Sequence, residues 1–411
     1  MTPNPFLGVS LHSVGGLAAG SFYIPFRKVK HWAWESYWLI QGLLAWIVMP
    51  SLVSAFTVPH LLGVMSTVEW QTFAAVYLFG ALWGVGGLTF GLSVRYLGMS
   101  LGYAVALGFC AAIGTLVPAI VREAFPAELM IWLLSGPGHR SGTMQSMVGV
   151  VAASDFPAVI RQDFPANLAA PSGLAILAGV ATCLAGIAIC GYAGVCKERA
   201  LTDQQKKETI REFALIKGFA VAVFAGVMSA CMAFAFAAGK PITQAAEAAG
   251  TEVFVNNPVF IIAMAGGFTT NLLWCLVLNV KNRSIRDYVS GPAARLAQNY
   301  CLAGLAGMIW YLQFFFYGMG TAVIGQKYGF SSWSIHMAFI IVFSNLWGMH
   351  FKEWKGVQRQ TLMLVWAGIL VLILSTLVIG WGNYLAAQPP QQPRDQSLIH
   401  TGSTEGLGIG D

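Results

Sequence analysis

The chain has 411 residues, of which 56% are hydrophobic and only 10% are charged, and its mean hydropathy is +0.66. An ordinary soluble domain carries about 25% charged residues, so this composition excludes a water-exposed globular protein. The net charge of +6 lies in short basic runs between apolar blocks, which is typical of cytoplasmic loops and not of a nucleic-acid-binding surface. We therefore predict an all-α integral membrane protein. It is surrounded by the lipid bilayer and has no nucleic-acid partner.

Ten apolar blocks follow one another along the chain, each of about the length that crosses a bilayer as a helix. Hydrocarbon offers no partner to backbone N–H and C=O groups, so these blocks must be helical. The predicted transmembrane helices are Phe6 to Ile24, Tyr37 to Phe56, Phe73 to Leu92, Leu101 to Val121, Gly173 to Tyr192, Gly218 to Ala238, Pro258 to Leu278, Ala297 to Tyr317, Trp333 to His350 and Leu362 to Trp381.

Basic residues set the expected orientation. Every second loop lies on the same side of the membrane, and most of the 23 Lys and Arg residues fall in one of these two sets of loops. The positive-inside rule makes the side of that set cytoplasmic. Both termini are then periplasmic.

The most charged stretch, residues 197–217, lies halfway along the chain. We predict that it is a cytoplasmic linker between two five-helix halves, residues 1–196 and 218–384. An odd number of spans per half inverts one half relative to the other, as in many secondary transporters. The first half carries an enlarged outside loop at 122–171, and a disordered tail is predicted for 385–411.

Histidine supplies the titratable groups at membrane depth, because no Asp, Glu, Lys or Arg lies in the middle of a predicted span. His12 falls well inside the first span, and His336 lies near the outer start of the ninth. An imidazole exchanges a proton near neutral pH, so both are candidates for a proton-coupling site. The alternative for His12 is a hydrogen bond to a neighbouring helix.

Uncharged polar and aromatic side chains inside spans form the next group. Amide groups recognise sugar hydroxyls, and aromatic rings cover the apolar face of a sugar ring. The candidate substrate-binding residues are Gln41, Asn271, Trp310, Tyr311 and Gln313. The alternative is an aromatic stripe packed within the bundle. Trp38, Trp333 and Trp354 lie at span ends, where tryptophan usually anchors a helix at the membrane interface.

No catalytic motif stands out, and neither an H-E-x-x-H nor a P-loop is present. The seven cysteines form no C-x-x-C pair, and nearly all lie in apolar blocks. We expect no enzyme activity, no metal and no cofactor.

Several strings along the chain resemble the L-rhamnose–proton symporter family of the drug/metabolite transporter superfamily. They include Pro25-Phe26-Arg27-Lys28, Arg95-Tyr96-Leu97-Gly98 and the run Trp310 to Tyr317. The motif residues at the first two strings and beside them are Tyr23, Pro25, Lys28, Glu35, Arg95 and Tyr96.

The resemblance implies ten helices in a bacterial inner membrane and uptake of L-rhamnose together with protons. The enlarged loop at 122–171 and the polar tail depart from the family pattern. Two alternatives stay open: a transporter of another sugar or metabolite, and a membrane sensor that binds sugar without moving it.

Overall fold

The computed structural model describes residues 3–97, 99–124, 170–200, 215–325 and 331–388, and these form a bundle of long helices without a strand among them. The first half contains α1 (Pro5–Ser21), η1 (Pro25–Lys28), α2 (Trp34–Leu43), η2 (Leu44–Val48), α3 (Met49–Thr57), α4 (Leu61–Ser66), α5 (Trp70–Leu97), α6 (Met99–Ala124) and α10 (Pro171–Ala200). The second half contains α12 (Leu215–Ala238), α13 (Lys240–Ala248), α14 (Asn257–Lys281), η3 (Ser284–Tyr288), α15 (Ala293–Ile324), α16 (Ser331–His350) and α17 (Arg359–Ala387).

Eight helical stretches in the described part of the chain are long and apolar enough to cross a membrane. They are Pro5–Lys28, Trp34–Thr57, Trp70–Ser93, Pro171–Lys197, Ile216–Ala238, Asn257–Lys281, Ala293–Ile324 and Arg359–Ala387. The chain is therefore a multi-pass membrane protein, as the composition predicts. The two remaining predicted spans correspond to the helices α6 and α16. More than half of α16 is buried, so Ser331, Ser332, Ser334 and His336 avoid lipid.

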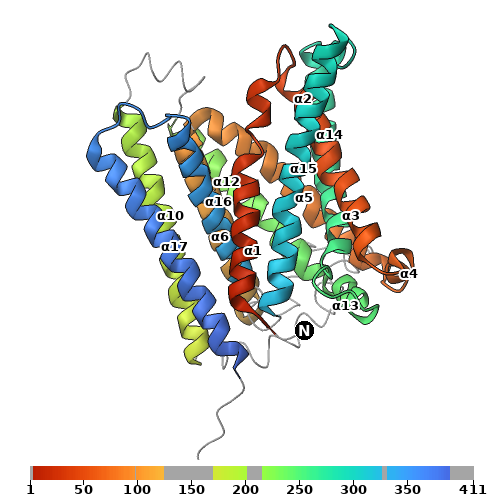
Figure 1. Ribbon diagram of the computed structural model, residues 1–411, viewed down its shortest axis with the longest axis vertical. Helices are drawn as coiled ribbons and strands as arrows, with labels where there is room; N and C mark the ends of the chain where they lie inside the picture. Colours follow the sequence, from red (N-terminus) through yellow and green to blue (C-terminus); the bar gives the residue numbers. More distant parts are fainter. Residues whose placement is uncertain (1–2, 98, 125–169, 201–214, 326–330, 389–411) are drawn as a thin grey trace, which may run out of the picture.

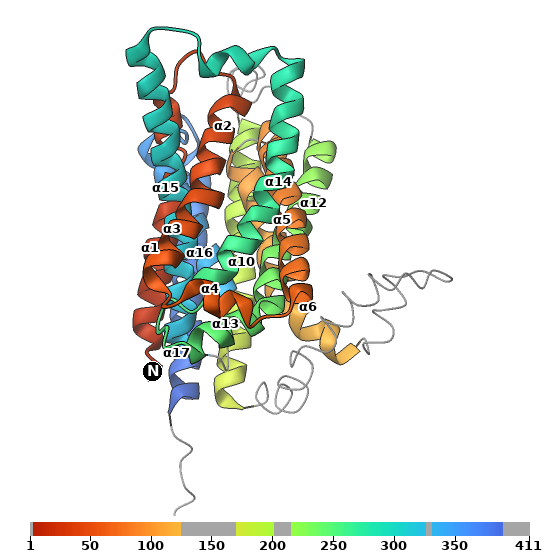
Figure 2. The ribbon, with the colours of Figure 1, turned by 90° about the vertical axis from the view of Figure 1, so that its right-hand side faces the viewer.

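The helices pack in a regular pattern of neighbours. Helices α10 and α17 lie side by side along one edge of the bundle (Figure 1). Helix α1 packs against α15 and α16, whereas α12 packs against α5 and α6. Figure 2 shows α14 running obliquely beside α5. Helix α1 begins and α17 ends at the same end of the bundle (Figure 1).

Glycines let α5 and α14 approach until their backbones touch. A Cβ added at Gly80 would collide with the carbonyl of Ala263, and one added at Gly266 would collide with the carbonyl of Tyr77. Hydrophobicity cannot drive helix association in lipid, so small residues and close van der Waals contact take its place. This seam joins a helix of the first half to one of the second.

The predicted linker and tail are only partly described. Residues 197–200 continue α10 and residues 215–217 belong to α12, while 201–214 lie outside the described residues. Most of the predicted loop at 122–171 also lies outside them. The predicted disordered tail begins too early, because Leu385–Ala387 form the last turn of α17.

Candidate functional site

A cavity of about 130 Å³ lies in the middle of the bundle, and both halves contribute to its wall. The first half supplies residues of α1, α2, η2, α5 and α6, and the second supplies residues of α12, α14, α15 and α16. Its aromatic lining comprises Phe22, Tyr23, Trp38, Trp46, Trp83, Phe90, Trp310, Phe314 and Trp333.

Three tryptophans form a tight cluster on one side of this cavity. The ring centroids of Trp46 and Trp310 are 5.4 Å apart, those of Trp83 and Trp310 are 5.7 Å apart, and those of Trp46 and Trp83 are 6.0 Å apart. Such rings present apolar faces that pack well against the C–H groups of a small solute. The wall is therefore suited to a ligand with an apolar face.

Asn271 and Gln313 add amide groups to the cavity lining, but their surroundings differ. The Asn271 Oδ1 accepts a hydrogen bond from Trp38 Nε1 at 3.0 Å. The Asn271 Nδ2 donates to the carbonyls of Gly84 at 3.3 Å and Gly267 at 2.8 Å. Gln313 is nearly buried. Asn271 thus holds Trp38 and α5 in place, whereas the Gln313 amide makes no hydrogen bond to the described residues.

Trp310 is the third predicted binding residue that lines the cavity, and Gln41 and Tyr311 do not line it. Both Gln41 and Tyr311 are fully buried. The Gln41 amide atoms and the Tyr311 hydroxyl have no hydrogen-bond partner among the described residues. The structure therefore gathers Asn271, Trp310 and Gln313 and leaves the other two within the α2–α15 packing.

Sequence reasoning placed Trp38 and Trp333 at the membrane interface, and the structure corrects this. Both are buried and line the cavity, and Trp333 Nε1 donates to the carbonyl of Cys110 at 3.2 Å. Trp354 is also buried, with Lys197 Nζ 5.0 Å from its ring centroid. A tryptophan near a span end can face lipid or a neighbouring helix, and sequence position does not distinguish the two.

His12 and His336 lie together, although they come from different halves. Their ring centroids are 6.0 Å apart, and the ring of Tyr317 lies 5.3 Å from His12 and 5.2 Å from His336. Both imidazoles are fully buried, and none of their four nitrogens has a hydrogen-bond partner among the described residues. The alternative for His12, a hydrogen bond to a neighbouring helix, is therefore not found among the described residues.

Glycines make room for this histidine pair. A Cβ on Gly320 would come within 2.9 Å of His12 Nε2, and a Cβ on Gly15 would come within 3.2 Å of His336 Cε1. Tyr317 also packs against Trp333, with centroids 5.7 Å apart. Because Trp333 lines the cavity, the histidine pair is connected to the cavity through two side chains in van der Waals contact.

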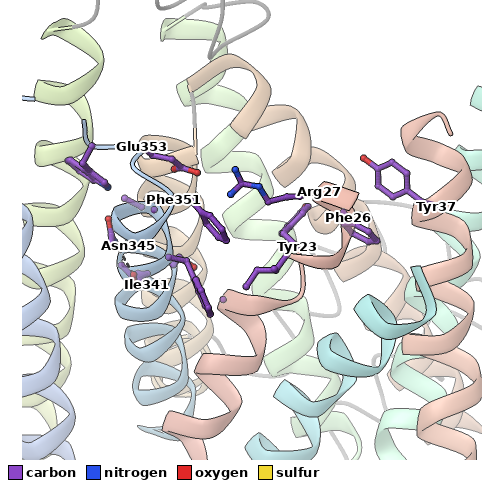
Figure 3. A pocket seen from close by; sticks show the side chains of 15 residues that line it. Tyr23, Phe26, Arg27, Tyr37, Ile341, Asn345, Phe351 and Glu353 are labelled. Carbon is purple, nitrogen blue, oxygen red and sulfur yellow. Dashed lines mark hydrogen bonds between the residues drawn. The ribbon is translucent and has the colours of Figure 1, made fainter. Parts of the chain in front are cut away.

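A second, larger cavity of about 340 Å³ opens between the end of α1 and the end of α16 (Figure 3). Arg27 and Glu353 project into it from opposite walls, and the Arg27 guanidinium carbon lies 3.9 Å from the ring centroid of Phe351. We call this cavity the vestibule. Tyr23 lines both the vestibule and the central cavity, so the two cavities share this residue in their walls.

The motif residues lie at the same end of the bundle as the vestibule. Pro25 starts the short helix η1, where its missing N–H costs nothing, and Lys28 is exposed at the end of η1. Glu35 is buried, and its Oε1 accepts hydrogen bonds from Ser284 Oγ at 2.6 Å and Asn282 Nδ2 at 2.9 Å. Glu35 thus joins α2 of the first half to the α14–η3 turn of the second.

Tyr96, at the end of α5, is buried, and Lys217 Nζ lies 4.8 Å from its ring centroid. Arg95 belongs to α5, and its side chain lies outside the described residues.

The fold and the cavities define a helical membrane protein with a solute-sized site between two packed halves. The sequence profile of the family described as L-rhamnose-proton symport protein matches residues 1–156 and 143–385. Proteins called L-rhamnose-proton symporter in Yersinia pestis (strain Pestoides F) and Yersinia pseudotuberculosis (serotype IB, strain PB1/+) are 36% identical over 379 residues. The aligned region covers 92% of this chain and 97% of each relative. The chain belongs to the L-rhamnose-proton symport protein family.

Proposed function

We propose that this protein is a secondary active transporter that takes up L-rhamnose together with protons across a bacterial inner membrane. The observation that carries the proposal is the central cavity, built by both halves and lined by tryptophans and amides, in a chain of this family. The related proteins are named for the same sugar and the same ion. It is not an enzyme, because its work is to move a solute unchanged.

We propose ten membrane-spanning helices in two inverted repeats. The packing pattern supports a two-fold relation between the halves. The first long helix of each half, α1 or α12, packs on the third and fourth long helices of the other half. The second long segments, α2–α3 and α14, pack on each other, and so do the fifth, α10 and α17. An inverted pair of five-helix units, with 197–217 as the linker, gives this pattern.

Local structure at the start of the two halves agrees with this repeat. Pro25 begins the short helix η1 directly after α1, and Pro241 lies at the start of α13 directly after α12. Proline is favoured at the first helical positions, where its missing N–H has no helical partner to lose. Each half therefore opens with a long helix followed by a proline-started short one.

The sugar occupies the central cavity in this proposal, and the vestibule is its route to the cytoplasm. Trp310 and the neighbouring indoles cover an apolar face of the sugar, and Gln313 hydrogen-bonds its hydroxyls. The vestibule lies at the end of the bundle that carries Arg27 and Lys28, which the positive-inside rule assigns to the cytoplasm. Both ends of the described chain then face the periplasm (Figure 1).

His12 and His336 form the proton site in this proposal. A positive charge on a buried, unpartnered imidazole is costly, so this closed arrangement favours two neutral rings. When the contact of α1 with α15 and α16 opens to the periplasm, water reaches the pair and a proton can bind. Closing the contact after sugar has bound buries the protonated pair, and the cost of that buried charge then drives the proton out toward the cytoplasm. Proton entry is thereby coupled to alternating access.

The energy available suits this task. One elementary charge crossing 100 mV is worth roughly 2.3 kcal/mol, and 1.4 kcal/mol corresponds to a tenfold concentration ratio. One proton per sugar therefore supports an accumulation of about fortyfold at that potential. No ATP or other cofactor is needed.

Uptake by purified protein in liposomes tests the proposal. We expect labelled L-rhamnose to accumulate when the outside is more acidic than the inside, and only to equilibrate after a protonophore collapses the gradient. Equal accumulation under both conditions would exclude proton coupling. Saturable binding without exchange of internal for external sugar would instead indicate a sensor, and preferential uptake of another sugar would change the substrate.

A further inference from the structure

Trp46 occupies an unusual stretch of backbone. It belongs to η2, a π-helical segment between α2 and α3 inside one membrane-spanning stretch. A π-turn inserts one extra residue into a helix and turns the side chains that follow, and such turns occur frequently at functional sites. Here the irregular turn coincides with the wall of the central cavity.

The Trp46 ring is held firmly by its neighbours. It makes edge contacts with Trp38, Trp83 and Trp310, with ring centroids 6.0, 6.0 and 5.4 Å away. Gly42 leaves space for it, because a Cβ at that position would come within 2.7 Å of the indole. A ring fixed in this way binds a ligand without a large loss of side-chain entropy.

The Trp46 Nε1–H is buried and has no hydrogen-bond partner among the described residues. Two other indoles of the same cavity are satisfied, since Trp38 donates to Asn271 and Trp333 donates to the carbonyl of Cys110. A buried donor without a partner costs free energy, and native proteins seldom retain one without a reason. The N–H is covered in this conformation, so a ligand oxygen would reach it after a small shift of the surrounding rings, and the new hydrogen bond would remove that cost.

We propose that Trp46 is a specificity-determining residue whose Nε1–H donates a hydrogen bond to one hydroxyl oxygen of the transported sugar. This inference rests on the proposed function and adds a named donor to its site. A site built to hydrogen-bond a hydroxyl discriminates strongly against a sugar that lacks it, because the protein group then stays unpaired. Trp46 therefore selects for an oxygen at one ring position, while Trp83 and Trp310 supply contact area.

The test combines protein and sugar changes. Trp46→Phe keeps an aromatic ring and removes the N–H, and Trp70→Phe, at an exposed tryptophan of α5, is the matched control. Affinity is measured for L-rhamnose and for its 2-deoxy, 3-deoxy and 4-deoxy analogues. We expect Trp46→Phe to weaken L-rhamnose binding about 5- to 150-fold, because the sugar hydroxyl is left buried without its donor. The variant and the wild type should bind one analogue equally well, namely the analogue that lacks the hydroxyl contacted by Trp46.

Equal loss of affinity for all four sugars would overturn the inference, as would no loss for any. Failure of the wild-type protein to bind L-rhamnose would instead refute the proposed function, so the two outcomes are distinguishable. If Trp46→Phe does not fold, Gly42→Ala supplies a second variant, because the new methyl group displaces the indole. Gly42→Ala should weaken binding of L-rhamnose more than binding of the analogue that lacks the contacted hydroxyl. Equal weakening for all sugars would overturn the inference.

Discussion

Asn271 and Gln313 both line the central cavity, and the structure predicts opposite consequences of replacing them with leucine. Asn271→Leu leaves Trp38 Nε1 without its acceptor, at a cost of about 1–3 kcal/mol. It also removes the two hydrogen bonds donated to Gly84 and Gly267, worth about 0.5–1.5 kcal/mol each. The free energy of unfolding should therefore fall by about 2–6 kcal/mol.

Gln313→Leu should leave stability within about 1 kcal/mol, because the structure shows no hydrogen bond from its amide to the described residues. It should impair transport instead. Losing a hydrogen bond to the sugar and leaving a sugar hydroxyl unpaired costs about 1–3 kcal/mol, which raises KM about 5- to 150-fold.

Gln41→Leu is the matched control, since the same substitution removes a buried amide that has no partner and does not line the cavity. Replacing an unpaired buried amide with an apolar group of similar shape is neutral or stabilising. Thermal unfolding in detergent and KM for L-rhamnose uptake separate the three variants. A raised KM with Gln41→Leu would refute the assignment of sugar binding to Gln313 and not Gln41. An Asn271→Leu protein as stable as the wild type would refute the structural role of Asn271.

Three further predictions follow from the same contacts. Gly320→Ala should reduce transport at least tenfold by displacing the His12 imidazole, while Gly304→Ala on the same helix should behave like the wild type, since its new Cβ would lie 3.9 Å from Leu44. His12→Gln and His336→Gln should each abolish the response of uptake to a pH gradient while sugar exchange continues, and a retained response would remove that histidine from the proton site. Glu35→Ala should lower the free energy of unfolding by about 1–3 kcal/mol, measured by thermal unfolding, because the buried Ser284 hydroxyl and the exposed Asn282 amide lose their shared acceptor.

The helices could be predicted from sequence because the bilayer imposes a simple rule. A long apolar stretch must be helical, so the predicted spans at Phe6 to Ile24 and Pro258 to Leu278 fall on α1 and α14. The run Trp310 to Tyr317 also pointed to the site, and Trp310 and Gln313 do line the cavity. The pairing of His12 with His336 required the structure, because residues from different halves meet only through tertiary packing.

The face that each side chain presents could not be predicted. In a soluble helix, polar residues mark the outside, whereas lipid and the bundle interior are both apolar and leave no such periodicity. Gln41 and Gln313 therefore looked alike in sequence, and only the structure separates them. The sequence could not single out Trp46 for the same reason, since its proposed role depends on a π-turn and an unpaired N–H.

The central claim is that sugar and proton move in the same step, and proton movement driven by the sugar tests it most directly. Adding L-rhamnose to de-energised, right-side-out vesicles should make the external medium more alkaline, because protons enter with the sugar. Vesicles carrying His12→Gln should take up the sugar with no pH change. Rapid L-rhamnose entry through the wild-type protein at constant external pH would contradict the account.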